Sequence, residues 1–235
     1  MILGLSHIAF SCDDIEAATE RLAMFGYARR FDEPRLKNNA AKADFMSRFQ
    51  PEHHIRALAA DEAMAIELLD HGGLSGPQSS ALIPVFRGVA PFADWQARPL
   101  VGLPVFEDGM VMLSDTLGQE PLAFYDPVLS MTLLWIQSKD EAPGLHACTV
   151  PTDAPEALKS LLGQLRFRPD TAGMWSLLTP LSALQARLIP VLSKQAKKWA
   201  EKPLLDAPGC ACMALMARGT VRASLPAALQ EKNVL

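Results

Sequence analysis

Histidine, cysteine and carboxylate side chains are the groups of this 235-residue chain that could hold a metal ion or move a proton. Of its 5 histidines, His7 and His146 stand at the start of apolar, strand-like stretches. His53 and His54 are neighbours, so in a strand they face opposite sides and are not expected to share one ion. The sequence contains no G-x-S-x-G, G-x-x-x-x-G-K-[ST], H-E-x-x-H or G-x-G-x-x-G motif. It therefore lacks the signatures of serine hydrolases, P-loop enzymes and zincins.

The stretches that follow His7 and His146 are similar to each other. They read HIAFSCDDIEAATERLAMFGYARRF and HACTVPTDAPEALKSLLGQLRFRPD, and they align after one residue is inserted behind the first strand. Each stretch continues with a D-x-x-E helix-start signal, in which Asp13 or Asp153 is expected to cap the helix. In the first copy, Gly26 is expected to end the helix. Both copies therefore predict a strand followed by an amphipathic helix.

Three further strand-like segments follow each helix, which predicts two βαβββ units. The expected strands are residues 27–31, 54–59 and 63–69 after the first helix, and 174–179, 187–192 and 210–217 after the second.

The central residues are expected to be rich in strands, but periodicity leaves two interpretations open. They form either a strand-rich linker or a degenerate third unit, with strands at 82–86, 110–114, 121–125 and 131–136 and a short helix at 92–98. The expected division of the chain is a first module at 1–72, the linker or third module at 73–143, a second module at 144–219 and a C-terminal tail at 220–235.

Two βαβββ units, with a histidine in the first strand of each and Glu67 in the fourth strand of the first, resemble the vicinal oxygen chelate superfamily. That superfamily contains glyoxalases, extradiol dioxygenases, epimerases and bleomycin-resistance-type binding proteins. The resemblance is carried by the sequences SHIAF around His7, AIELLD around Glu67 and LHAC around His146. It implies an α+β fold in which paired βαβββ modules form a curved, half-open barrel, with the central segment as an additional strand-rich part.

The alternation of side chains along a strand agrees with this resemblance. Ile8 and Phe10 should face the helix, which leaves His7 on the other side of the sheet, and the same alternation places Glu67 on the side of His7. A carboxylate on the inner face of a sheet is costly unless it has a partner such as a metal ion. A charged residue facing solvent on an uncovered sheet would explain Glu67 equally well.

The resemblance implies a divalent metal held by His7, Glu67 and His146. Two histidines and one carboxylate suit Fe(II) and also accept Mn, Ni, Co or Zn. A fourth ligand is missing, since aligning CMALM with AIELL places Ala214 opposite Glu67. Glu67 is also the candidate catalytic base. Arg56, in the third strand, is the candidate for binding a carboxylate or enediolate substrate.

The implied function is that of a metal-dependent, glyoxalase-like enzyme acting on a small organic substrate that chelates the metal through vicinal oxygens. The reaction would be that of a lyase or isomerase, or of a dioxygenase. The alternative is a metal-free small-molecule-binding protein of the same fold, similar to bleomycin resistance proteins, and the missing fourth ligand favours it.

Composition restricts the partners and the compartment. With 22 Lys and Arg against 26 Asp and Glu, the net charge is −4, so no nucleic-acid partner is expected. No run of about 18 apolar residues predicts a membrane span. The 4 cysteines form no C-x-x-C pair and indicate neither a disulfide framework nor a zinc site, so a cytoplasmic location is expected. The expected partner is a small-molecule substrate, and a homodimer is left open.

Overall fold

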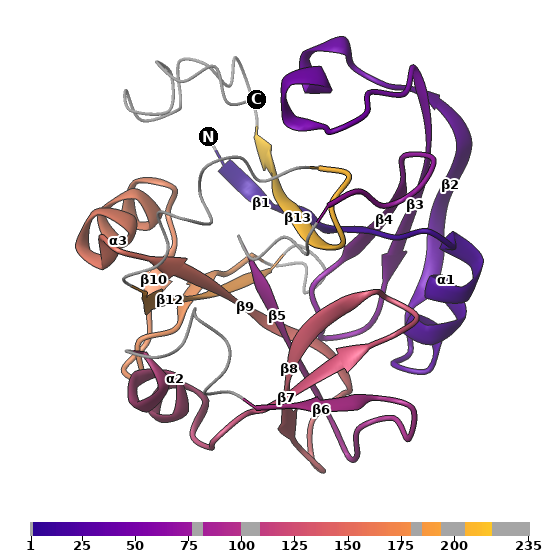
Figure 1. Ribbon diagram of the computed structural model, residues 1–235. Helices are drawn as coiled ribbons and strands as arrows, with labels where there is room; N and C mark the ends of the chain where they lie inside the picture. The colour runs from indigo at the N-terminus through magenta and orange to yellow at the C-terminus, as the bar shows by residue number, and fades with distance from the viewer. Residues whose placement is uncertain (1, 77–81, 100–108, 180–184, 194–204, 218–235) are drawn as a thin grey trace.

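The structure is a computed structural model that describes residues 2–76, 82–99, 109–179, 185–193 and 205–217 (Figure 1). These residues form two β-sheets, which we call sheet A and sheet B. Sheet A has the strand order β13-β1-β4-β3-β2, and sheet B has the order β10-β11-β12-β9-β5-β8-β7-β6. The predicted α+β class is confirmed, and both sheets are open rather than closed into a barrel.

The first βαβββ unit is built as predicted. It consists of β1 (Ile2–Ser11), α1 (Ile15–Ala23), β2 (Ala28–Lys37), the 3₁₀ helix η1 (Ala40–Phe45), β3 (Glu52–Ala59) and β4 (Ile66–Asp70). Because β1 pairs in parallel with β4, Ala9 lies opposite Glu67 in the register.

Helix α1 begins and ends at identifiable signals. Its cap is Asp14, whose carboxylate accepts hydrogen bonds from the backbone N–H groups of Glu16 and Ala17. Asp13, the predicted cap, instead accepts a hydrogen bond from the backbone N–H of Leu74. The helix ends before Gly26, whose φ of 83° is in the left-handed region that favours glycine.

The rest of the described chain contains two more groups of four strands. The central group is β5 (Ile83–Gly88), β6 (Gln96–Arg98), α2 (Met110–Leu117), β7 (Leu122–Asp126) and β8 (Met131–Gln137). The last group is β9 (Gly144–Thr152), α3 (Pro155–Gln164), β10 (Arg168–Pro169), β11 (Trp175–Leu177) and β12 (Ala186–Leu192). α3 has no side-chain cap, so Asp153 does not have the predicted role, and Pro155 supplies its first turn.

The same order of four strands occurs three times in the two sheets. The orders β1-β4-β3-β2, β5-β8-β7-β6 and β9-β12-β11-β10 are equivalent, so the central segment has the strand order of a third unit. The structure differs from the predicted central elements in two places. Residues 110–114, predicted as a strand, belong to helix α2, and residues 96–98, predicted as part of a helix, form strand β6. The central unit joins the last unit through antiparallel pairing of β5 with β9.

The last described strand, β13 (Gly209–Ala217), lies in a different place from the one predicted. It was expected to complete the second module, but it pairs antiparallel with β1 in sheet A. The fourth strand of the second unit is instead β12, which pairs in parallel with β9 as β4 does with β1. The predicted alignment of Ala214 with Glu67 is therefore wrong, and Ala214 lies opposite His7. The predicted tail at 220–235 lies outside the described residues.

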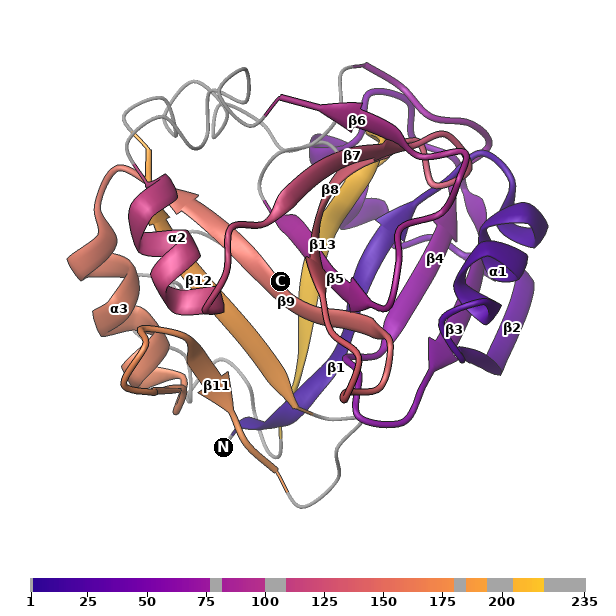
Figure 2. The same ribbon diagram turned by 90° about the horizontal axis from the view of Figure 1, so that it is seen from below.

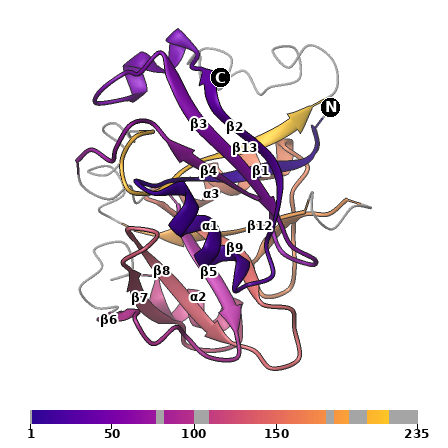
Figure 3. The same ribbon diagram turned by 90° about the vertical axis from the view of Figure 1, so that its right-hand side faces the viewer.

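One hydrophobic core joins the two sheets. It contains Ile8 and Phe10 of β1, Leu22 of α1, Trp135 of β8 and Leu162 of α3. Figure 3 shows α1 between the strands of sheet A and strands β5 to β8. No helix among the described residues is long and apolar enough to cross a membrane.

The opposite face of sheet B has a helix of its own. Leu113 of α2 is fully buried against Val85, Leu134, Ile189 and Val191. These side chains alternate with those that face the shared core, so α2 and α3 cover the two faces of sheet B (Figure 2). Sheet A has α1 on its core side, and its other side carries His7 and Glu67.

Candidate functional site

We call the side of sheet A that faces away from α1 the His7 face. The predicted alternation is confirmed, since Ile8 and Leu68 pack in the shared core while Ala9 and Leu69 form a separate cluster with Ile55. The face carries His7 and Ala9 of β1, His53 and Ile55 of β3, Glu67 and Leu69 of β4, and His71 directly after β4.

His7 and Glu67 are brought together at this face. The imidazole Nε2 of His7 lies 3.1 Å from the carboxylate Oε2 of Glu67, and the two side chains are 21% and 16% exposed. The other ring nitrogen, Nδ1, lies 3.1 Å from the hydroxyl oxygen of Ser6. Ser6 stands where the register between β1 and β13 shifts, and such a bulge turns neighbouring side chains out of strict alternation. Both ring nitrogens of His7 are thereby oriented.

Two further histidines lie near the end of the same face. The rings of His53 and His71 stack with their centroids 5.0 Å apart, and both side chains are buried. Burial and the positive charge of Lys42 lower the pKa of both imidazoles, that of His53 to about 4. Among the described residues, Nδ1 of His53 and both ring nitrogens of His71 have no hydrogen-bond partner.

Neither histidine is among the site residues predicted from the sequence. His53 and its neighbour His54 face opposite sides of a strand and are not expected to share one ion. The alternation of β3 could have found His53, since its hairpin partner β4 places Ile55 opposite Leu69, and His53 lies on the same side as Ile55.

Between the His7–Glu67 pair and the stacked rings of His53 and His71, the face is apolar. Ala9, Ile55 and Leu69 are buried and form one cluster, against which the partly buried Cys212 of β13 packs. Burial and the nearby charge of Glu67 raise the pKa of the Cys212 thiol, which favours its neutral, hydrophobic form. The His7 face therefore offers a carboxylate and an imidazole at one end of an apolar floor.

His146, the third predicted ligand, lies on sheet B. Its Nδ1 is 3.2 Å from Nη1 of Arg87, and its carbonyl oxygen accepts a hydrogen bond from Arg187. Burial, together with the positive charges of these two guanidinium groups, lowers the pKa of His146 to about 4. The same charges would repel a metal cation at this imidazole.

The structure thus brings two of the three predicted ligands together. His7 and Glu67 are close enough to contact one ion, but the described residues contain no group of three or more His, Cys, Asp or Glu side chains that could hold a metal. The predicted three-ligand centre does not fit the side chains as they are placed.

Arg56, the predicted substrate-binding residue, faces the helix side of sheet A. Its side chain is 3% exposed and donates hydrogen bonds to both carboxylate oxygens of Glu16 and of Asp32 and to the hydroxyl of Thr19. These bonds tie β3 to α1 and β2. The guanidinium has no donor directed toward the His7 face, so its role is structural.

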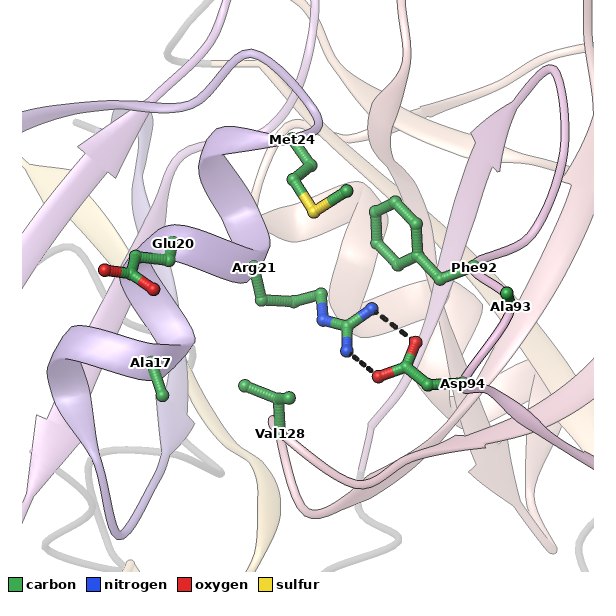
Figure 4. Close-up of a pocket in the computed structure, with 8 residues that line it drawn as sticks. All are labelled: Ala17, Glu20, Arg21, Met24, Phe92, Ala93, Asp94 and Val128. Carbon is green, nitrogen blue, oxygen red and sulfur yellow. Dashed lines mark hydrogen bonds and ion pairs between the residues drawn. The ribbon is translucent and has the colours of Figure 1, made fainter.

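A groove of about 520 Å³ lies elsewhere, between α1 and the loop after β5 (Figure 4). Arg21 of α1 reaches across it to form an ion pair with Asp94 and packs over the ring of Phe92, 4.6 Å from its centroid. Its Nε also lies 3.5 Å from the buried carboxylate of Asp126. Arg21 and Asp94 of this groove are therefore paired with each other, and none of the predicted site residues lines the groove.

The architecture is similar to that of solved structures. A mutant of glyoxalase I from Zea mays aligns with 97% of this chain and 80% of its own length, at 11% sequence identity and a TM-score of 0.55. A further structure of glyoxalase I from Zea mays aligns with 90% of this chain and 73% of its own, at 11% identity and a TM-score of 0.50. No protein-family model and no curated protein matches the sequence. The chain therefore has the fold of glyoxalase I.

Proposed function

We propose that the protein is a glyoxalase-like enzyme that moves a proton on a small organic molecule bound at the His7 face. His7 and Glu67 would be its acid–base pair. The observation that carries this proposal is the 3.1 Å contact between His7 Nε2 and Glu67 Oε2 in a partly exposed position. An imidazole and a carboxylate within hydrogen-bond distance can take up and return a proton near neutral pH.

The surroundings support a small-molecule site. The apolar floor of Ala9, Ile55 and Leu69 would hold a carbon skeleton beside the polar pair. The equivalent side of sheet B offers no such place, because α2 packs on it with Leu113 fully buried. The substrate class we propose is a compound with two neighbouring oxygens and a proton made acidic by a carbonyl group.

The proposed chemistry uses protein groups alone. A dioxygenase reaction has less support than an isomerase or lyase reaction, since His146 lies among arginines instead of completing a ligand set with His7 and Glu67.

The acid–base role is tested by solvent exchange. A panel of small α-hydroxy ketones and 2-oxo aldehydes is incubated with the protein in D₂O, and deuterium incorporation next to the carbonyl group is followed by proton NMR. We expect the protein to accelerate exchange on at least one compound, and Glu67→Gln to lower that rate by about 100-fold or more. Glu120→Gln, an exposed carboxylate in the turn after α2, should keep the full rate. No exchange with any compound, or full exchange in Glu67→Gln, contradicts the proposal.

Metal content is measured on the same samples. The untagged protein is purified without chelators and analysed for Fe, Mn, Ni, Co and Zn. We expect less than one equivalent in total. A stoichiometric ion that is lost in both His7→Ala and Glu67→Gln, with folding intact, would assign the pair to a metal centre and overturn the metal-free mechanism.

A binding protein without catalysis is the second candidate, favoured by the apolar floor of the His7 face and by the incomplete ligand set. It predicts that a hydrophobic compound raises the melting temperature of the wild type in a saturable way while no compound undergoes exchange. An Ile55→Asp variant, which places a charge on the floor, should abolish that shift.

A further inference from the structure

A second polar cluster lies on sheet B, away from the His7 face. It consists of Arg87 at the end of β5, His146 near the start of β9 and Arg187 near the start of β12, and we call it the basic cluster. The three residues stand on neighbouring strands, because β9 lies between β5 and β12 in the sheet. His146 occupies a shift in register, since Phe86 lies opposite Leu145 while Val85 lies opposite Ala147. The bulge turns the side chain of His146 out of strict alternation and toward the arginines.

Arg87 determines which ring nitrogen of His146 carries the proton. Its side chain is 5% exposed, and it donates to the carbonyl oxygen of Ala142 and forms an ion pair with Glu141 at 2.8 Å. A guanidinium only donates hydrogen bonds, so the contact of 3.2 Å with Nδ1 of His146 makes that nitrogen an acceptor. The neutral imidazole then carries its proton on Nε2.

Arg187 is a cation without a carboxylate partner among the described residues. Its guanidinium donates two long hydrogen bonds, of 3.5 Å to the carbonyl oxygen of His146 and of 3.4 Å to the side-chain oxygen of Gln185. Burial and the like charge of Arg87 lower its pKa, and the charges of Glu141 and Glu62 oppose that effect. A half-buried cation beside a second cation is destabilising unless an anion is bound.

We propose that the basic cluster is a binding site for an oxyanion, the carboxylate or phosphate group of a small molecule. Arg187 offers a planar pair of N–H donors, and His146 offers its Nε2–H beside them. Arg87, already paired with Glu141, orients His146 and adds positive charge without contacting the ligand.

A purely structural role is the competing explanation. Arg87 has structural contacts of its own to the 140–143 loop through Glu141 and Ala142. Among the described residues, in contrast, Arg187 makes only weak side-chain hydrogen bonds, and a structural arginine would be expected to have better ones. The two explanations differ in whether a soluble anion occupies the site.

The test uses the full chain and two probes, inorganic phosphate and acetate, at constant ionic strength maintained with chloride. Binding is measured by isothermal titration calorimetry and by the shift in melting temperature. We expect at least one probe to bind saturably to the wild type, and the comparison of phosphate with acetate to show which oxyanion is preferred. Arg187→Gln should weaken binding about tenfold or more, and Arg187→Lys should weaken it less, since it keeps the charge and loses the planar fork. Arg168→Gln, an exposed arginine of β10, is the matched control and should bind as the wild type does.

A second measurement needs no variant and so does not depend on the folding of Arg187→Gln. The ring signals of His146 in the isotope-labelled wild type should move with the same saturation curve as the heat of binding. Saturable binding lost in Arg187→Gln, together with this movement, supports the site. Absence of saturable binding of both probes, equal binding by Arg187→Gln, or His146 signals that do not move would overturn it.

Discussion

Arg56 and Arg187 show, at the scale of single residues, how the partners of an arginine reveal its role. Within the described part of the chain, Arg56 donates five hydrogen bonds to acceptors on α1 and β2, whereas the guanidinium of Arg187 donates two long ones. The guanidinium of Arg56 holds the pKa of Asp32 well below its usual range, which shows how strongly this carboxylate depends on its partner.

Replacing Arg56 tests its structural role. Arg56→Ala removes a buried guanidinium and leaves Asp32 and Glu16 without their main partner, so we expect the free energy of unfolding to fall by about 2–4 kcal/mol. Arg35→Ala, which breaks the exposed pair with Glu52, should cost far less stability. Urea denaturation measures both. An Arg56→Ala variant that keeps its stability but loses ligand binding would restore the predicted substrate-binding role.

The buried His53 predicts a dependence of stability on pH. Its pKa is about 4 in the folded chain and about 6.5 when unfolded, so the unfolded state binds the proton more tightly. Stability due to the neutral imidazole is therefore present above about pH 6.5 and is lost as the pH falls toward about 4. The loss from this residue is about 2 kcal/mol at about pH 5.

The comparison of His53 with its neighbour isolates that effect. Denaturation at pH 7 and pH 5 should show a smaller loss of stability in His53→Gln than in the wild type. His54→Gln, on the other side of β3, should not reduce the loss, because His54 pairs with Asp32. Equal losses in His53→Gln and the wild type would show that His53 is not buried in its neutral form.

At the scale of elements, the start of α1 depends on one carboxylate. Asp14→Ala removes the acceptor for two backbone N–H groups, so the unfolding free energy should fall by about 1 kcal/mol. Glu20→Ala, an exposed position on the same helix, should change it by less than about 0.5 kcal/mol. Thermal denaturation distinguishes the two. If Asp13→Ala proved the costlier change, the predicted cap would be the correct one.

Local patterns predicted most elements, and they failed where a pattern fits two structures. The alternation in β1 and β4 placed His7 and Glu67 on one side because the side-chain period of a strand is fixed. The apolar run at 110–114 is too short for its period to distinguish strand from helix, and it begins α2. The partner of β13 could not be predicted, since strand pairing depends on distant parts of the chain. The position of His146 beside Arg87 could not be predicted for the same reason.

At the scale of the whole molecule, Tyr27 fastens the two sheets to each other. Its buried hydroxyl donates to the carbonyl oxygen of Met64, before β4, and accepts from the backbone N–H of Leu145 in β9. Burial raises the pKa of this phenol, so it stays protonated and keeps its donor. The hydroxyl thus bonds one backbone group just before β4 of sheet A and one in β9 of sheet B.

Removing that hydroxyl should loosen the contact between the sheets. Tyr27→Phe leaves a buried carbonyl and a buried N–H without a partner, and we expect a loss of about 1–3 kcal/mol in unfolding free energy. Hydrogen exchange of the Leu145 amide should become faster. Tyr125→Phe, at a half-buried tyrosine of β7, is the control. An equal loss of unfolding free energy in both variants would show that Tyr27 has no special role.

The pairing of β1 with β13 has a consequence for synthesis on the ribosome. Ile8 lies opposite Met213, so one edge of β1 must wait for the last described strand before it gains its neighbour. Such distant closure slows folding and leaves a strand edge exposed to other nascent chains. We expect the newborn polypeptide to need protection by chaperones until residues 209–217 have left the exit tunnel.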